Sequence, residues 1–224
     1  MTGSAISELL CARHSCRAFL PEPVPRPLVD RIFSTAQRTA SWCNAQPWHA
    51  TVASGEALER LRTLLLRRFD EQHPATPDLA FPSAYVGRYL DRRRQCGLQL
   101  YESVGVGRHD TQAAMRQSRE NFRFFGAPHV AVMTTHAQLG VYGAVDVGGF
   151  VQVLMLVMQA HGVASICQAA PAAYGNEVKG LLGIDLSRQM VCAVSFGYEA
   201  AAHPANSFRT QRACTDEAVT WIND

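Results

Sequence analysis

Lysine is almost absent from this 224-residue chain: Lys179 is the only one, and arginine supplies the other twenty cations. Covalent chemistry through a lysine Schiff base would depend on that one residue, so the composition argues against it. The 21 basic residues are nearly balanced by 19 acidic ones, giving a net charge of +2. This balance disfavours a nucleic acid or an anionic membrane as a partner.

Long apolar runs and a secretion signal are also missing. No basic stretch followed by an apolar one occurs near the N-terminus, so the sequence predicts no secretory signal. The longest apolar run, residues 148–160, contains Gln152 and Gln159 and is too short to cross a bilayer. It predicts the buried core helix of a soluble, cytoplasmic protein.

The motifs of several enzyme classes are absent. Seven cysteines form no CxxC pair, which argues against a zinc site or a disulfide scaffold and favours reduced thiols; no metal site is predicted. The sequence has no GxGxxG after a strand and no GxxxxGK[ST], which disfavours a Rossmann or P-loop mechanism. It also has no HExxH and no GxSxG, so zinc hydrolases and serine esterases are disfavoured.

Hydrophobic periodicity predicts a mostly helical chain with three or four short strands. The expected helices cover residues 5–12, 27–38, 55–69, 84–104, 110–125, 144–161, 176–182 and 215–221. The expected strands cover residues 49–53, 130–133 and 189–196. Strands separated by helices indicate an α+β or α/β layered arrangement. Nothing marks an internal boundary, so we expect a single domain over residues 1–224.

Arginines gather near both ends of the chain. Arg13, Ser15 and Arg17 alternate just after the first predicted helix. In an extended segment the three side chains would project to one face and bind a phosphate or another anion. A basic helix end that complements the helix dipole is the alternative. Arg209 and Arg212 lie in a predicted loop, which taken alone is typical of a solvated turn.

Two further segments are unusually polar for their surroundings. In the loop at residues 41–48, Asn44 and Gln46 lie between Trp42 and Trp48, a pattern that suits a planar ring recognised at its edge. A structural loop with its own capping is the alternative. Residues 167–168, Cys-Gln, interrupt an apolar stretch, and a satisfied core glutamine is the simpler explanation there.

The order of these segments resembles the FMN-dependent nitroreductase family, in particular its nitrobenzoate-reductase-like branch. The resemblance covers about residues 6–222. It is carried by RHSCRAF, SWCNAQPWH, YLDRRRQCGLQLYESVGVGRHD, NFRFFGAPH, GVASICQAAPAAYGNEVKGLLGI and SFGYEAAAHPANSFRTQR, in that order. Each motif alone is moderately specific, whereas the ordered set is highly specific.

The resemblance implies a fold and a reaction. The fold would be α+β, with three layers, a central mainly antiparallel sheet flanked by helices, and an intertwined homodimer. FMN would be the cofactor and NAD(P)H the co-substrate, with nitroaromatic or quinone-like acceptors reduced by a ping-pong hydride mechanism. Flavin N5 would carry the hydride, so no general base is required. Alternatives are another flavin reaction on this fold, such as dehalogenation, ene or quinone reduction or small-substrate oxidation, and a non-catalytic flavin-binding redox sensor.

The resemblance also assigns the arginine motifs. Arg13 and Ser15 would hold the FMN phosphate, His14 would contribute backbone contacts, and Arg17 would approach the pyrimidine side of the flavin as electrostatic support. At the other end of the chain Arg212 matches the family's phosphate arginine most closely. Arg209 is a second candidate.

The resemblance also assigns roles to the two polar segments, residues 41–48 and 167–168. Ser41 and Asn44 would contact the flavin of the partner subunit, with Gln46 supporting the loop, although Ala40 stands where the family usually has proline. The backbone at Gln168 and Ala169 would lie beside the flavin ring. Cys167 occupies a position where the branch commonly has proline, so its thiol could lie close to the flavin ring. The alternative, which we expect, is a buried and inert cysteine.

The sequence leaves the acceptor open. Residues 92–94, three arginines, could attract a carboxylate-bearing acceptor, but a solvated helix face is the simpler interpretation. The aromatic residues that could shape an acceptor pocket, with core packing as the alternative for each, are Tyr85, Tyr89, Trp48 and Phe124.

Overall fold

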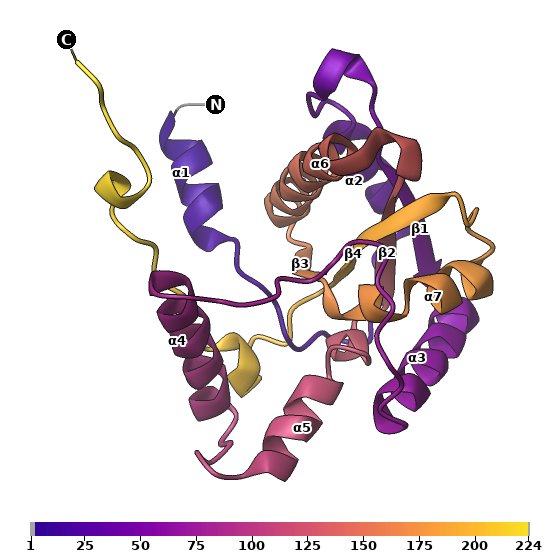
Figure 1. Cartoon of the computed structure of the whole chain (residues 1–224), viewed down its shortest axis with the longest axis vertical. Coiled ribbons are helices and arrows are strands. Elements are labelled where there is room, and N and C mark those ends of the chain that lie inside the picture. Colours follow the sequence, from indigo (N-terminus) through magenta and orange to yellow (C-terminus); the bar gives the residue numbers. More distant parts are fainter. Residues whose placement is uncertain (1–2, 224) are drawn as a thin grey trace.

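The computed structural model describes residues 3–223 and is built around one four-stranded sheet. The strands are β1 (His49–Ser54), β2 (His129–His136), β3 (Ala164–Gln168) and β4 (Arg188–Gly197). Their order in the sheet is β1-β2-β4-β3, and every neighbouring pair is antiparallel (Figure 1). The predicted strands are confirmed, and β3 is the strand that the periodicity did not separate.

Alternation along β2 divides the core between the two faces of the sheet. Val130 and Val132 face α3 (Gly55–Asp70) and α7 (Gly175–Leu182), whereas Ala131 and Met133 face α2 (Arg26–Ala36) and α6 (Gly140–Ala160). Successive residues of a strand point to opposite faces, so a strand with apolar residues throughout must be covered on both sides. Helices on both faces of an antiparallel sheet make the α+β, three-layer arrangement that the resemblance implied.

Three helices pack outside these layers. They are α1 (Gly3–Ala12), α4 (Arg88–Ser103) and α5 (Thr111–Arg119), and none of them contains a buried residue. In Figure 1, α1 and α4 lie on the side away from α3 and α7, with the C-terminal segment beside them, whereas α5 lies at the bottom, where its last residue, Arg119, pairs with Asp70 at the end of α3. Short 3₁₀ turns complete the described residues: Trp42–Asn44, Phe124–Gly126, Ala137–Leu139, Ala170–Tyr174, Pro204–Asn206 and Thr215–Glu217.

Most predicted helices agree with the structure within a few residues, and the exceptions have local causes. The Asp110 side chain accepts a hydrogen bond from the backbone N–H of Ala113 and caps α5, as predicted. That helix ends at Arg119 and not near residue 125, because Phe124 and Phe125 adopt positive φ and enter the core. Helix α4 begins at Arg88, four residues late. The predicted C-terminal helix is wrong: only one 3₁₀ turn forms there.

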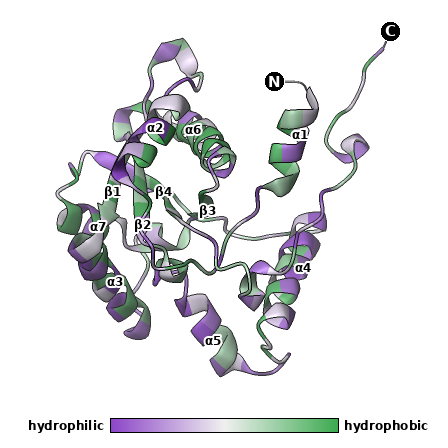
Figure 2. Cartoon of the chain, turned by 180° about the vertical axis from the view of Figure 1, so that it is seen from behind, coloured by the Kyte–Doolittle hydropathy of each residue, from purple (hydrophilic) through white to green (hydrophobic). Residues whose placement is uncertain are grey.

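Helix α6 is longer than its sequence pattern suggested. With the preceding turn, the helical segment spans Ala137–Ala160, and an 18-residue window within it has a mean hydropathy of 1.8, so the segment is long and apolar enough to span a membrane by length and composition. The apolar run at residues 148–160 is the C-terminal part of this longer helix. Val147, Phe150 and Leu154 pack against the sheet, so one face serves as a core helix. Figure 2 shows its hydrophobic character continuing around the helix.

Candidate functional site

The segment that follows α1 presents its polar side chains on one face. Cys16 and Ala18 are buried, whereas Arg13, Ser15 and Arg17 point away from the core, as the predicted alternation requires. The backbone N–H of Cys16 donates to the carbonyl oxygen of Ser165 at 3.1 Å, which fixes the segment beside β3. Burial raises the pKa of Cys16 to about 12, so this thiol stays protonated.

A cavity of about 580 Å³ brings the two ends of the chain together. Arg13, Ser15 and Arg17 line it from the N-terminal side, and Arg209 and Arg212 line it from the C-terminal side. The full lining is Leu10, Cys11, Arg13, His14, Ser15, Arg17, Cys96, Phe208, Arg209, Thr210 and Arg212. No acidic side chain belongs to this set. Four guanidinium groups without a carboxylate form a site for an anion.

Arg17 carries a charge that no carboxylate of residues 3–223 neutralises. Its Nη1 donates to the carbonyl oxygen of Ser15 at 3.2 Å, and its guanidinium lies 5.5 Å from the centroid of the Phe208 ring. Burial lowers its pKa from the ordinary arginine value. Arg17 also lines a second cavity, of about 640 Å³, next to α5. The guanidinium is thus fixed, desolvated and available to a bound anion.

Asn206 organises this site, although the sequence analysis assigned it no role. It is 3% exposed, and its Oδ1 accepts the backbone N–H of Arg17 at 2.7 Å. Its Nδ2 donates to the carbonyl oxygens of Ala18 at 2.9 Å and Ala200 at 3.2 Å. The residue joins the two arginine segments, and an asparagine three residues before Arg209 was the only signal available.

Two of the residues predicted to contact FMN have side chains that already make hydrogen bonds within the chain. His14 Nε2 lies 2.9 Å from Glu199 Oε1, and Nδ1 lies 3.2 Å from the carbonyl oxygen of Ala12. Gln168 is buried, donates to the carbonyl oxygen of Asn121 at 2.8 Å and accepts from Ser195. It is the satisfied core glutamine of the simpler interpretation. Only the backbones of these residues remain available, the part that the resemblance assigned to cofactor contacts.

The expectation of a buried Cys167 is wrong. Its thiol is exposed, while Cys192 on the neighbouring strand lies buried beneath it. A hydrogen bond between them lowers the pKa of the Cys167 thiol, because the contact stabilises its thiolate. All seven cysteines are free, and residues 3–223 contain no group of three or more His, Cys, Asp or Glu side chains placed to hold a metal ion.

Ser41 and Asn44 lie apart from the arginine cavity of their own chain. Their loop packs against the beginning of α6, where Trp42 contacts Tyr142 with ring centroids 4.4 Å apart. The neighbouring hollow measures about 320 Å³ and contains no residue of the arginine cavity. Ser41 Oγ accepts the backbone N–H of Gln46 at 2.9 Å, in line with the loop-supporting role expected of Gln46.

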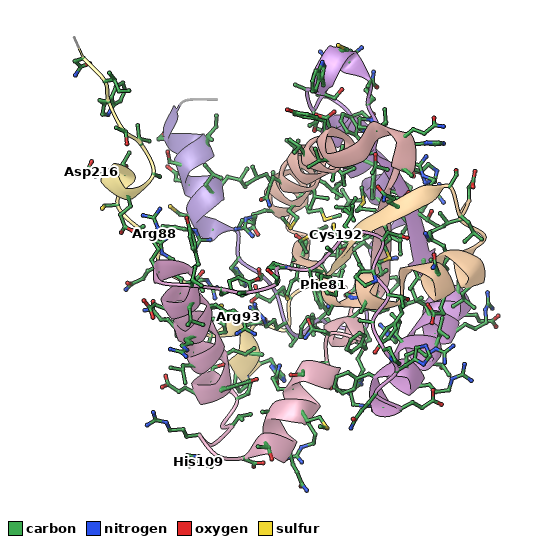
Figure 3. The ribbon with its side chains drawn as sticks, viewed as in Figure 1. Phe81, Arg88, Arg93, His109, Cys192 and Asp216 are labelled. Atoms are coloured by element: carbon green, nitrogen blue, oxygen red, sulfur yellow. The ribbon has the colours of Figure 1, made fainter. Side chains whose placement is uncertain are left out.

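The candidate acceptor residues divide between core and surface. Trp48 stacks on Phe150 with centroids 4.8 Å apart, and Phe124 is fully buried, so both belong to the core. Tyr85 and Tyr89 are 43% and 54% exposed. The three arginines at residues 92–94 are also exposed; the first pairs with Glu217 at 2.6 Å and the second stacks on Tyr85. Figure 3 shows Arg88 and Arg93 along α4, far from Cys192 in the sheet.

Comparisons with known proteins show the family of this chain. The model of the Nitroreductase family matches residues 10–198. Nitroreductase NfnB of Mycolicibacterium smegmatis is 35% identical over 97% of this chain and 92% of its own length. The 4-nitrobenzoate reductase of Pseudomonas putida is 32% identical over 91% of this chain and 89% of its own.

A solved structure gives the same result in three dimensions. The FMN-dependent nitroreductase NfnB from Mycobacterium smegmatis, crystallised in complex with NADPH, superposes with a TM-score of 0.93 at 33% identity. The match covers 98% of this chain and 99% of that one. On sequence and on fold, this chain belongs to the nitroreductase family.

Proposed function

We propose that this protein is an FMN-dependent oxidoreductase that uses NAD(P)H to reduce nitroaromatic acceptors. The observation that carries the proposal is the cavity in which Arg13, Ser15 and Arg17 meet Arg209 and Arg212 without an acidic neighbour. The FMN- and NADPH-dependent enzymes among its structural relatives, and the nitrobenzoate reductases among its sequence relatives, support the same conclusion.

The residues of the cavity fit FMN. A phosphate is a doubly charged acceptor of hydrogen bonds, and Arg13, Ser15, Arg209 and Arg212 would hold it with charge-assisted donors. Arg17 would face the pyrimidine edge of the ring. The backbones of His14, Gln168 and Ala169 would add contacts, since the side chains of the first two are already engaged within the chain.

The protein's part in the reaction is electrostatic and positional. Bound FMN supplies the two-electron chemistry between NAD(P)H and the acceptor. Arg17 provides fixed positive charge from a desolvated position, where it acts without first having to reorganise. No side chain has to abstract a proton from carbon, so a catalytic base is unnecessary. The chain orients the ring, neutralises charge and excludes water.

The active unit in this proposal is a homodimer with shared sites. Ser41 and Asn44 cannot reach the arginine cavity of their own chain in this arrangement, so a second subunit would bring them to it. Val141, Tyr142 and Val145 are 69%, 57% and 61% exposed on α6, close to the same loop. A broad apolar face of this kind suits an obligate interface.

The remaining parts of the proposal concern organisation and location. Residues 1–224 form a single FMN-binding domain, and the cytoplasm is its location, in keeping with its free thiols. The acceptor is a small aromatic molecule that enters beside the flavin.

A spectroscopic and a kinetic experiment test the proposal. Purified protein should show the flavin absorption spectrum and release FMN, not FAD, on denaturation. Anaerobic addition of NADH or NADPH should bleach that spectrum, and a nitroaromatic such as 4-nitrobenzoate should restore it. Protein that takes up no FMN on reconstitution would disprove the proposal, as would holoprotein that NAD(P)H reduces but no nitroaromatic reoxidises.

A further inference from the structure

The loop at residues 41–48 holds an unfavourable backbone conformation. Cys43, Asn44 and Gln46 all have positive φ, at 50°, 55° and 48°, a region that side chains with a Cβ seldom adopt. Contacts to α6 keep it in place: the backbone N–H of Trp42 donates to the Asp146 carboxylate at 3.2 Å, and its ring packs against Tyr142. The loop is thus held in one conformation from outside.

Hydrogen bonds from the side-chain amide of Gln46 determine the orientation of the Asn44 amide. Gln46 Nε2 lies 3.2 Å from the main-chain carbonyl oxygen of Asn44 and 3.1 Å from the Asn44 side-chain oxygen, Oδ1. A main-chain carbonyl only accepts, so the Gln46 atom beside it must be the nitrogen. That nitrogen only donates, so the Asn44 atom beside it must be the oxygen. Two contacts therefore fix both amides.

This arrangement leaves Asn44 with its donors facing outward. Oδ1 is used by Gln46, while Nδ2 makes no hydrogen bond to any of residues 3–223. We propose that Gln46 is a positioning residue that turns the N–H groups of Asn44, and not its carbonyl, toward FMN bound across the subunit interface. The proposal rests on the proposed function and its shared site.

The polarity matters because FMN is rich in acceptors at its edges. Its phosphate, its two pyrimidine carbonyls and the N1 and N5 atoms of the oxidised ring accept hydrogen bonds, N3–H is the one ring donor, and reduction adds negative charge to the pyrimidine. An outward N–H meets these groups favourably, whereas a flipped amide would set a carbonyl oxygen against them. Without a neighbouring hydrogen bond, the asparagine amide could take either orientation. The bond from Gln46 fixes one of them.

Substitutions separate orientation from general support of the loop. Gln46→Met keeps the length of the side chain and removes its donor, and Gln46→Glu offers only an acceptor and should turn the Asn44 amide around. Gln138→Met and Gln138→Glu are the matched controls. Gln138 lines the same hollow as Trp42 and Cys43 and is exposed, and its side chain makes no hydrogen bond within the described chain. Asn44→Ala and the double variant with Gln46→Met complete a double-mutant cycle.

The readouts are the FMN dissociation constant, from recovered flavin fluorescence, and the midpoint potential of the holoprotein. Gln46→Met should weaken FMN binding by about 3- to 10-fold, the worth of one neutral hydrogen bond. Gln46→Glu should weaken it more and lower the potential. In the Asn44→Ala background, Gln46→Met should cause no further loss. Both Gln138 variants should match the wild type.

Equal effects of Gln46→Met with and without Asn44 would overturn the proposal, because Gln46 would then act on the loop and not on the amide. Equal effects of Gln46→Glu and Gln138→Glu would also overturn it, since charge alone would explain the loss. FMN binding and nitroaromatic reduction by the wild-type protein test the proposed function separately. If it binds FMN and reduces a nitroaromatic, a failed cycle removes only the orienting role.

Discussion

Replacing Asn206 by alanine should weaken the hydrogen bonding that connects the two segments carrying the cavity arginines, residues 13–17 and 206–212. The side chain is buried and makes three hydrogen bonds, to the backbone N–H of Arg17 and to the carbonyl oxygens of Ala18 and Ala200, at 2.7, 2.9 and 3.2 Å. Asn206→Ala leaves the N–H of Arg17 unpaired, whereas the carbonyl oxygens of Ala18 and Ala200 keep the hydrogen bonds that they accept from the N–H groups of Ala200 and His203, at 3.0 and 2.9 Å. The unpaired Arg17 N–H costs about 1–3 kcal/mol, reduced where water replaces the lost partner, and each of the two other lost bonds costs about 0.5–1.5 kcal/mol.

We therefore expect Asn206→Ala to lower the free energy of unfolding of the FMN-free protein by about 2–4 kcal/mol. The variant should also weaken FMN binding by roughly 10-fold, because it frees the backbone that positions Arg17 at the cavity wall. Urea unfolding at a fixed protein concentration measures the first quantity, since the stability of an oligomer depends on concentration. Fluorescence of released FMN measures the second.

Asn176→Ala is the matched control, because Asn176 is an exposed asparagine on α7 and makes no hydrogen bond with its side chain among residues 3–223. It should change the free energy of unfolding by less than about 0.5 kcal/mol. If Asn206→Ala behaves like this control in both assays, Asn206 does not join the two segments and the reasoning is refuted.

Three further predictions concern the charged groups and the subunits. Arg13→Ala and Arg212→Ala should each weaken FMN retention by about 1.5–3 kcal/mol per lost charge-assisted bond, measured by equilibrium dialysis; retention equal to wild type in both would remove them from the phosphate. Arg17→Ala should keep FMN better than Arg13→Ala but lower the two-electron potential by about 30–60 mV in a redox titration, and an unchanged potential would return Arg17 to a surface role. Mixed dimers of an inactive Arg13→Ala chain and an inactive Asn44→Ala chain should regain activity, because one site in each would be intact; mixed dimers that form without activity would contradict the shared site.

Local patterns predicted much of the fold because their causes are local. Periodicity located most helices, since an amphipathic stripe follows from the residues of the helix itself. The C-terminal helix failed for the opposite reason. Its exposed segment has no surface against which to bury an apolar face, and short helices are marginal without such packing. The early end of α5 also depends on tertiary packing. Phe124 and Phe125 are buried in the core with positive φ angles, which an α-helix does not allow.

The sequence predicted the types of residue in the candidate site better than it predicted their burial. Alternation at Arg13, Ser15 and Arg17 indicated an anion-binding face, and the resemblance added the matching arginines at the other terminus. Burial could not be predicted for Cys167, because its position on β3 shows only which residues are its neighbours in the strand. What lies above that strand is decided by segments remote in sequence.

The sequence by itself determined most of the helices and strands, which residue types could bind FMN, and the family to which the order of motifs points. These follow from spacing, charge and composition along a continuous stretch of chain. Only the tertiary structure decided which polar groups remain available. His14 is engaged by Glu199 and Gln168 by Asn121, whereas Arg17 has no carboxylate partner among the described residues and is held by Asn206. The physical reason is that a hydrogen bond or an ion pair depends on distance in space, which folding sets between residues far apart in the chain.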